Sequence, residues 1–224
     1  GLCWLEPESN AVLCLQYSCG TWPENDGNIL MESVSFEDMR RAMVDSQLRT
    51  NGVTEAWILG AMGSLPREDH VPASHRATSY MDRAIPLEDG SVLNPPLSTG
   101  LLLQAAEVKT SDKTLLIGNP SGYVAELLKG HVAHLTCAAP ADWASAKGSA
   151  PYDLIVIDGA VEELPDAFLS LASDGTRIVS GIAEGPVTRL ANGVVRASKI
   201  ALVPFIDSEI APLAAFARKA EFVF

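Results

Sequence analysis

A glycine-bracketed turn between a short apolar run and a helical pattern is the stretch of this sequence best suited to hold a ligand. The apolar run is Leu115–Ile117, the turn is Gly118–Tyr123, and the helical pattern continues from Val124 to Leu128. A strand, a tight turn and a helix start in this order form the nucleotide-binding corner of a doubly wound α/β domain, where small residues let the backbone approach a ligand. The candidate ligand-binding residues of this turn are Gly118, Asn119, Ser121, Gly122 and Tyr123.

Asp158 is a second candidate because it directly follows another apolar run, Leu154–Ile157. The carboxyl ends of parallel strands face the ligand crevice of an α/β sheet, so this is the acid best placed for binding or chemistry. An acid at a strand end that caps the next turn is an equally common arrangement. The sequence leaves both roles open.

Histidines and cysteines do not form a recognisable metal or nucleophile pattern. His131 and His134 lie three apart in a predicted strand, so their side chains face opposite ways. Cys14 and Cys19 are separated by four residues without a nearby histidine, which is not a zinc spacing. We therefore predict no metal site, and we favour reduced thiols over disulfides. The four cysteines are Cys3, Cys14, Cys19 and Cys137.

Composition narrows the class of protein. The chain has 224 residues, 47% of them hydrophobic, which predicts a sizeable buried core. Its formal net charge of −12 argues against a nucleic-acid or anionic-membrane partner. No apolar run approaches the roughly 18 residues of a membrane span, and the first residues lack the pattern of a secretory signal. The expected compartment is the cytoplasm, and the oligomeric state stays open.

The first 31 residues differ from the rest because they contain no lysine or arginine. We predict an extension over 1–31, with a native start at Met31 or a hairpin-like appendage as the alternatives. A helical region follows over 32–107 and an α/β domain over 108–224. In the helical region, Ser35, Thr54 and Ser98 are predicted helix caps, and Asn51-Gly52 is a predicted helix end.

Apolar runs alternate with helical stretches in the second half, which predicts a mostly parallel sheet with helices on both faces. The predicted helical stretches are Val124–Leu128, Leu164–Leu171 and Leu213–Ala220. The predicted strands are Thr114–Ile117, Val132–Cys137, Leu154–Asp158, Arg177–Ile182 and Ile200–Phe205.

A series of short motifs runs in a fixed order through the first half and continues more weakly into the second. The motifs are Met43–Arg49, Gly52–Thr54, Pro66–Glu68 with Val71-Pro72, Tyr80–Asp82, Leu93–Pro96, Gly118–Tyr123, Pro151–Val156 and Asp174–Val179. In this order they closely resemble the protein-L-isoaspartate O-methyltransferase family. The resemblance covers about residues 35–205 and is most specific before Leu128.

The resemblance implies a Rossmann-like methyltransferase fold with an N-terminal helical region that helps form the substrate site. It implies methyl transfer from S-adenosylmethionine to isoaspartyl carboxyl groups of a protein or peptide substrate, with the cofactor at Gly118–Tyr123 and near Asp158. The family serine that contacts the isoaspartyl group corresponds to Asn94, which is therefore the candidate catalytic residue.

Several positions depart from the family pattern. Leu116 replaces an acid, and Pro120 replaces a glycine and so removes an N–H from the turn. The second predicted strand is not followed by the carboxylate that would accept hydrogen bonds from a ribose diol, and the next acid is Asp142. The interval 136–151 has room for a single short helix but not for a further strand–helix unit, because a βαβ unit needs about thirty residues.

These departures leave three hypotheses for function. The chain is an active methyltransferase, a methyltransferase-fold pseudoenzyme that serves as a binding module, or an enzyme whose pocket is rearranged or completed by a partner. We assign structural roles to other matched residues: an ion pair between Arg67 and Glu68, loop orientation by Asp82, and packing by Trp57 and Trp143.

Overall fold

The computed structural model of the chain describes residues 34–218. The described part begins with helix α1, Phe36–Ala42, whose first turn is capped by Ser35: the Asp38 N–H donates to Ser35 Oγ at 3.1 Å. A π-helical turn, Met43–Leu48, and a 3₁₀ turn, Arg49–Asn51, continue the same path. They end at Gly52, whose φ of 92° favours glycine. The predicted cap at Ser35 and the predicted helix end are both confirmed.

The predicted caps of the next two helices are wrong. Helix α2, Ala56–Ser64, begins after Glu55, and the backbone N–H of Thr54 donates to Gln104 Oε1 at 2.7 Å instead. Helix α3, Pro96–Ala105, begins two residues before Ser98, because proline already has the φ of a first helical turn and needs no donor there.

Asp82, for which the sequence predicts a role in orienting a loop, binds the first turn of helix α3. Its Oδ1 accepts a 3.1 Å hydrogen bond from the backbone N–H of Leu97. A carboxylate at this place satisfies a free N–H of the first helical turn and interacts favourably with the helix dipole.

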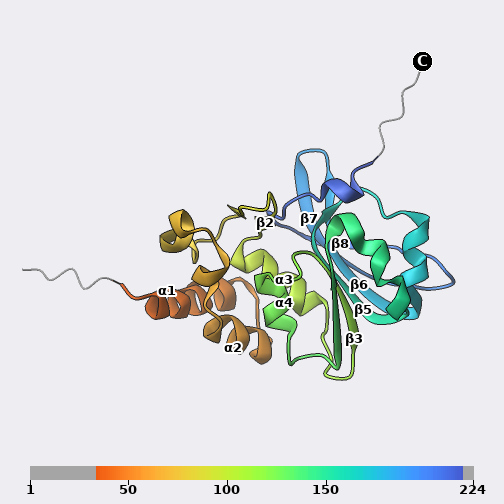
Figure 1. Ribbon diagram of the computed structural model, residues 1–224. Helices are drawn as coiled ribbons and strands as arrows, with labels where there is room; N and C mark the ends of the chain where they lie inside the picture. Colours follow the sequence, from red (N-terminus) through yellow and green to blue (C-terminus); the bar gives the residue numbers. More distant parts are fainter. Residues whose placement is uncertain (1–33, 219–224) are drawn as a thin grey trace, which may run out of the picture. The chain divides into compact units, whose positions relative to one another are not determined.

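A six-stranded sheet follows the helices, in the spatial order β4-β3-β5-β6-β7-β8 (Figure 1). The first four strands in this order are parallel, and β7 and β8 are antiparallel to their neighbours, which confirms a mostly parallel α/β fold. The strands are β3 Lys113–Ile117, β4 His134–Ala138, β5 Tyr152–Val161, β6 Ala172–Glu184, β7 Val187–Val194 and β8 Val203–Asp207. A separate two-stranded sheet pairs β1, Ile85–Pro86, with β2, Val92–Leu93.

Strand β7 was not predicted from the sequence. It alternates apolar residues with Thr188, Arg189 and Asn192, so it lacks the continuous apolar run that marks the parallel strands. It forms a hairpin with β6 through Gly185, whose φ is 62°. Antiparallel strands joined by such a turn need no intervening helix.

The predicted shortening after the second parallel strand is confirmed. Strand β4 lies at the edge of the sheet, and the chain passes from it to β5 through a single 3₁₀ segment, Pro140–Ser149. Two other stretches expected to be helical are also short 3₁₀ segments, Asp166–Leu171 and Ala214–Phe216.

Apolar side chains cover both faces of the sheet. Along β3, Leu116 packs into the core on the side of α2, α3 and α4, while Leu115 and Ile117 pack into the core on the other side. Helix α4, Tyr123–Leu128, contacts α2, which in turn contacts α3. On the opposite side Trp143 packs against Phe168, with ring centroids 5.4 Å apart, which confirms its packing role.

Two features are absent from the described residues. Among residues 34–218, no helix combines the length and apolar character needed to cross a membrane. No cluster of three or more histidine, cysteine or acidic side chains suited to a metal lies within the same residues. Cys3, Cys14 and Cys19 and the extension predicted over residues 1–31 lie outside the described part.

Candidate functional site

The turn after β3 is closed by its own hydrogen bonds. The Asn119 carbonyl accepts the N–H of Gly122 at 3.0 Å, and Asn119 Oδ1 accepts the N–H of Ser121 at 3.0 Å. Pro120 stands between them and has no N–H, which suits the second position of such a turn. A Cβ at Gly122 would lie 2.9 Å from Asn119 Cβ, so the turn requires glycine there. The backbone amides of residues 120–122 are therefore absent or already used inside the turn.

Gly118 brings the end of β3 close to strand β5. A Cβ on Gly118 would lie 3.0 Å from Asp158 Cβ, closer than almost all side chains approach. The predicted turn residues and Asp158 therefore meet at one place, directly after the last pair of β3 and β5, Ile117 and Ile157. This is where ligands bind in open α/β sheets. Contrary to the prediction from the sequence, Asp158 does not end its strand, because β5 continues to Val161.

Asp158 is a recessed carboxylate with one hydrogen-bond partner in the described structure. Its Oδ1 accepts a 2.8 Å hydrogen bond from Asn94 Nδ2. Burial raises the pKa of Asp158, while the Asn94 hydrogen bond and the attraction of the Arg67 guanidinium lower it. Burial has the largest effect of the three, so loss of hydration disfavours the ionised form of the Asp158 carboxyl group.

Asn94 connects three segments of the chain. It is 1% exposed, its Oδ1 accepts the N–H of Ala211 at 2.8 Å, and its backbone carbonyl accepts a 2.6 Å hydrogen bond from Arg67. Its side chain thus holds Asp158 on one side and the segment after β8 on the other. Its predicted contact with a substrate remains a prediction.

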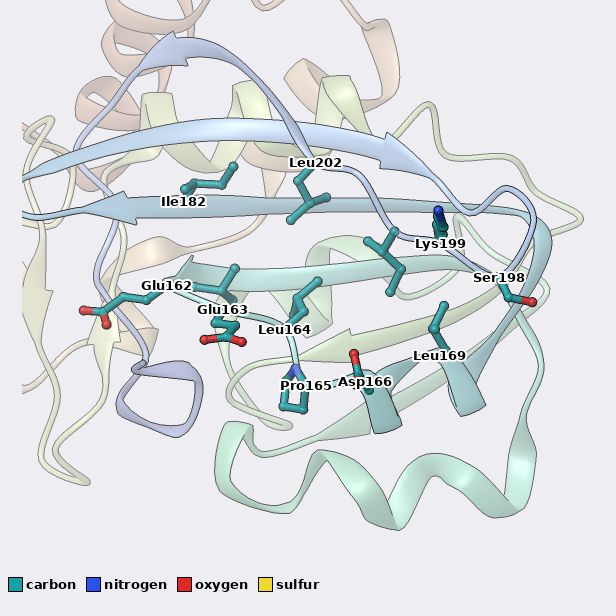
Figure 2. A pocket seen from close by; sticks show the side chains of 12 residues that line it. Glu162, Glu163, Leu164, Pro165, Asp166, Leu169, Ile182, Ser198, Lys199 and Leu202 are labelled. Atoms are coloured by element: carbon teal, nitrogen blue, oxygen red, sulfur yellow. The ribbon is translucent and has the colours of Figure 1, made fainter. Parts of the chain in front are cut away.

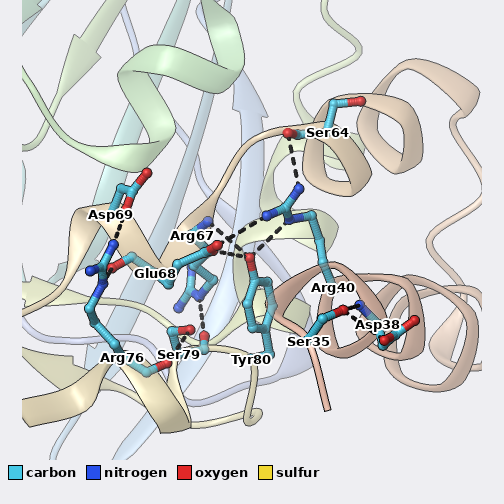
Figure 3. Close-up of polar contacts among 10 residues, drawn as sticks. All are labelled: Ser35, Asp38, Arg40, Ser64, Arg67, Glu68, Asp69, Arg76, Ser79 and Tyr80. Carbon is cyan, nitrogen blue, oxygen red and sulfur yellow. Dashed lines mark hydrogen bonds and ion pairs between the residues drawn. The ribbon is translucent and has the colours of Figure 1, made fainter. Parts of the chain in front are cut away.

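The predicted ion pair between Arg67 and Glu68 is wrong. Successive residues of a 3₁₀ turn point about 120° apart, so the two side chains face different neighbours. Glu68 binds Arg40 at 3.1 Å and accepts a hydrogen bond from the hydroxyl of Tyr80 (Figure 3). Arg67 is fully buried and donates to the Ser79 carbonyl at 2.8 Å.

Arg67 also lies against the predicted turn residue Tyr123. Its guanidinium carbon is 5.1 Å from the centroid of the Tyr123 ring, a distance typical of a cation–π contact. The hydroxyl of Tyr123 is buried and has no hydrogen-bond partner among the described residues. Burial raises the pKa of Tyr123. Arg67 therefore fixes both the loop that carries Asn94 and the start of α4.

Two cavities, each of about 440 Å³, meet at this place. We call the first the turn cavity, because the Ser121–Tyr123 end of the turn lines it together with residues 69–73 and 87–89. We call the second the sheet-end cavity, because Gly118, residues 139–141 and residues 211–215 line it. Four residues line both: Asp89, Val92, Asn119 and Asp158.

The wall of the sheet-end cavity after β4 is apolar. It consists of Ala139, Pro140 and Ala141, and Asp142 is exposed and is not among the residues that line the cavity. Leu213 forms part of another wall and packs so closely on Gly159 that a Cβ there would lie 2.4 Å from Leu213 Cγ. This cavity therefore has no carboxylate after β4 to accept a diol.

Asp89 lines both cavities but is not among the site residues predicted from the sequence. Asp89 Oδ1 accepts hydrogen bonds from the N–H and hydroxyl of Ser91, and its Oδ2 lies 3.4 Å from Asn119 Nδ2. The Asp89-Gly90-Ser91 sequence is a turn signal. That signal places Asp89 in a loop but says nothing of which other loop it reaches.

A third cavity of about 440 Å³ shares no lining residue with the other two. Its side chains include Glu162, Glu163, Leu164, Lys199 and Leu202 (Figure 2). None of the predicted site residues lines it.

Comparisons with known proteins bear on the family. The family model "Protein-L-isoaspartate(D-aspartate) O-methyltransferase (PCMT)" matches residues 39–142. A protein-L-isoaspartate O-methyltransferase of Herpetosiphon aurantiacus is 30% identical over 174 residues, which cover 66% of this chain and 78% of the relative. A protein-L-isoaspartate O-methyltransferase of Koribacter versatilis is 29% identical over 165 residues, which cover 62% of this chain and 74% of the relative.

A solved structure named protein-L-isoaspartate O-methyltransferase shares the fold. It superimposes with a TM-score of 0.63 at 15% identity, covering 80% of this chain and 66% of that one. This likeness supports a Rossmann-like methyltransferase fold.

Proposed function

Because the chain belongs to the protein-L-isoaspartate O-methyltransferase family, we propose that it binds S-adenosylmethionine and methylates isoaspartyl carboxyl groups of a protein or peptide. The observation that carries this proposal is the position of Asp158. It directly follows the last β5 residue that pairs with β3 and lies beside the turn after β3, where two cavities meet. Family membership supplies the reaction, and this geometry supplies a place for it.

The residues of the sheet-end cavity fit the cofactor in size and charge. A volume of about 440 Å³ lies within the range of small-molecule sites. The sulfonium and ammonium of S-adenosylmethionine are cations, and Asp158 and Asp89 are the carboxylates that line this cavity. We therefore propose that Gly118, Asn119 and Asp158 contact the cofactor. The ribose diol has no carboxylate after β4 and would bind less strongly than in a site that has one.

We propose that the turn cavity receives the acceptor. Ser121, Gly122 and Tyr123, which the sequence placed with the cofactor, line this cavity and would contact the methionine end of the cofactor or the acceptor. Asn94 holds Asp158 at the junction of the two cavities. Asn94 Nδ2 donates to Asp158 Oδ1 at 2.8 Å and to the Asp158 carbonyl at 3.5 Å, so a contact between this amide and a substrate would compete with these two bonds.

S-adenosylmethionine supplies a methyl group bonded to a positive sulfur. A carboxylate acceptor is already ionised at neutral pH, so the protein does not need a strong base. What the chain must supply is position: a rigid turn, a fixed Asp158 and a cavity that excludes water. The rigid turn comes from Pro120 and the hydrogen bonds of Asn119, and Asn94 fixes Asp158.

Isothermal titration tests cofactor binding directly. The proposal expects heat on addition of S-adenosylmethionine and of S-adenosylhomocysteine, and methyl incorporation into an isoaspartyl peptide but not into its aspartyl counterpart. Absence of heat and of a thermal shift at saturating ligand would contradict it.

A binding module without cofactor is the second candidate. The closed turn favours it, since the amides of residues 120–122 are absent or paired and the wall after β4 is apolar. Under this hypothesis the chain would bind a peptide but neither S-adenosylmethionine nor S-adenosylhomocysteine. Titration with each ligand separately discriminates the two candidates.

A further inference from the structure

The turn cavity is acidic. Its lining includes Asp69, Glu88, Asp89 and Asp158, and neither lysine nor arginine is among the residues that line it. His70 also lines it, but burial lowers the pKa of His70, so this ring is neutral at pH 7. The surface that would receive the acceptor therefore carries negative charge without a positive counterpart of its own.

Neighbouring groups neutralise only part of this charge. Asp69 forms an ion pair with Arg76 just outside the cavity. Asp89 is bound by neutral donors, the N–H and hydroxyl of Ser91, which lower its pKa and keep it ionised. Glu88 forms no ion pair with another described residue.

Asp158 adds a recessed acceptor to the acidic rim. Its Oδ1 is held by Asn94, and its Oδ2 has no hydrogen-bond partner among residues 34–218. The Arg67 guanidinium attracts Asp158 but forms no ion pair with it in the described structure. A ligand that brings hydrogen-bond donors and positive charge would satisfy this acceptor.

The charges of the turn cavity would repel a free carboxylate. The acceptor of the proposed reaction is itself an anion, and it would approach Glu88, Asp89 and Asp158. Like charges across a binding surface disfavour a partner, and opposite charges favour it and speed encounter. The peptide that carries the acceptor can supply the missing positive charge on its neighbouring residues.

We propose that the turn cavity selects isoaspartyl peptides in which lysine or arginine flanks the acceptor, and that Glu88 and Asp89 are the specificity-determining residues. This inference rests on the proposed function for the identity of the acceptor. Its physical basis is charge complementarity between a basic segment and the acidic rim. An acidic segment is excluded by the same charges.

Three matched peptides test the proposal. They share one isoaspartyl residue and carry lysine, glutamine or glutamate at the two positions on each side. We expect the KM for the lysine peptide to be at least about tenfold below that for the glutamate peptide, with the glutamine peptide between them and kcat similar. The difference should shrink as salt rises, because salt screens exposed charges.

Charge-removing variants identify the residues responsible. Glu88→Gln combined with Asp89→Asn should bring the KM ratio of the lysine and glutamate peptides close to one. Glu163→Gln removes the same kind of charge from the third cavity and should leave the ratio at its wild-type value. Equal KM values for the three peptides, or preference for glutamate, would overturn the proposal.

Peptide binding measured by fluorescence anisotropy separates this proposal from the proposed function. If S-adenosylmethionine neither binds nor reacts, the proposed function fails, yet the order lysine, glutamine, glutamate in peptide affinity would still support charge selection. If methyl transfer occurs equally well on all three peptides, the proposed function stands and the charge selection is refuted.

Discussion

Asn94 Nδ2 and Asp158 Oδ1 form a 2.8 Å hydrogen bond that joins the loop before α3 to strand β5. The two residues are 64 positions apart in the chain. The same asparagine accepts the backbone N–H of Ala211, so a single amide holds three segments around the site. The predictions below follow from this arrangement and from its neighbours.

Asn94→Ala should destabilise the fold. It removes the partner of the Ala211 N–H and the donor to Asp158, both of them recessed, and an unpaired buried polar group costs about 1–3 kcal/mol. Urea denaturation measures the change in the free energy of unfolding. The control variant Asn192→Ala removes an exposed side chain on β7 and should change the free energy of unfolding by less than about 0.5 kcal/mol. Equal losses in the two variants would show that Asn94 does not hold these segments.

Arg67→Ala should cost about 3 kcal/mol, because two buried carbonyl groups lose a charged donor. Arg67→Lys should recover only part of this loss, since an ammonium cannot replace the planar fork that reaches both carbonyls. The melting temperature and urea midpoint of each variant measure the effect. Full recovery by lysine would mean that charge alone, rather than the two-point geometry, is what the site requires.

Asp158→Asn should change the pH dependence of stability. Burial raises the pKa of Asp158 in the folded state, so the folded chain retains this proton at pH values where the unfolded chain releases it. The folded state therefore loses stability from this group as pH rises from the unfolded pKa through the raised folded pKa. Asp158→Asn removes that loss, and its stability relative to wild type should increase with pH across this window. Urea denaturation at several pH values would show a constant difference if Asp158 does not titrate this way.

Ala139→Asp should strengthen binding of S-adenosylmethionine. It places a carboxylate on the wall after β4, where Ala139 is exposed and lines the sheet-end cavity. A hydrogen bond that involves a charged group contributes about 1.5–3 kcal/mol, roughly tenfold or more in affinity. Titration calorimetry on both proteins measures the change. Unaltered affinity in a variant that folds normally would mean that the diol lies elsewhere.

Pro120→Gly should not produce a similar gain. The new N–H enters a turn already closed by Asn119, and glycine adds conformational freedom to the unfolded chain. We expect a loss of about 0.4–1 kcal/mol in stability and no gain in cofactor affinity. Tighter binding by this variant would identify Pro120 as the main obstacle in the site.

Much of the fold follows from local sequence patterns. Ser35 caps its helix and Gly52 ends the next turn because both effects depend on neighbouring residues alone. The parallel strands are visible because burial on both faces demands continuous apolar runs. Strand β7 is only partly buried, and its polar residues interrupt the apolar run that would predict a strand.

The site is less visible in the sequence because its contacts are long-range. The turn and Asp158 could be placed at one edge of the sheet from the strand pattern, and Gly118 confirms their approach. The partners of Asn94, Arg67 and Glu68 could not be predicted from the sequence. For Arg67 and Glu68, adjacency in sequence predicted an ion pair that the 3₁₀ geometry prevents. Whether the predicted site residues bind a cofactor remains a prediction.

The segment Ala211–Leu213 is among the last parts of the site to be synthesised. Its backbone exchanges hydrogen bonds with Ala160, and it supplies a wall of the sheet-end cavity. Domains emerge from the ribosome with their N-terminal parts first. The turn, Asp158 and Asn94 are therefore all synthesised before the wall that encloses them, and a nascent chain stopped at β8 would have its sheet strands but an open pocket.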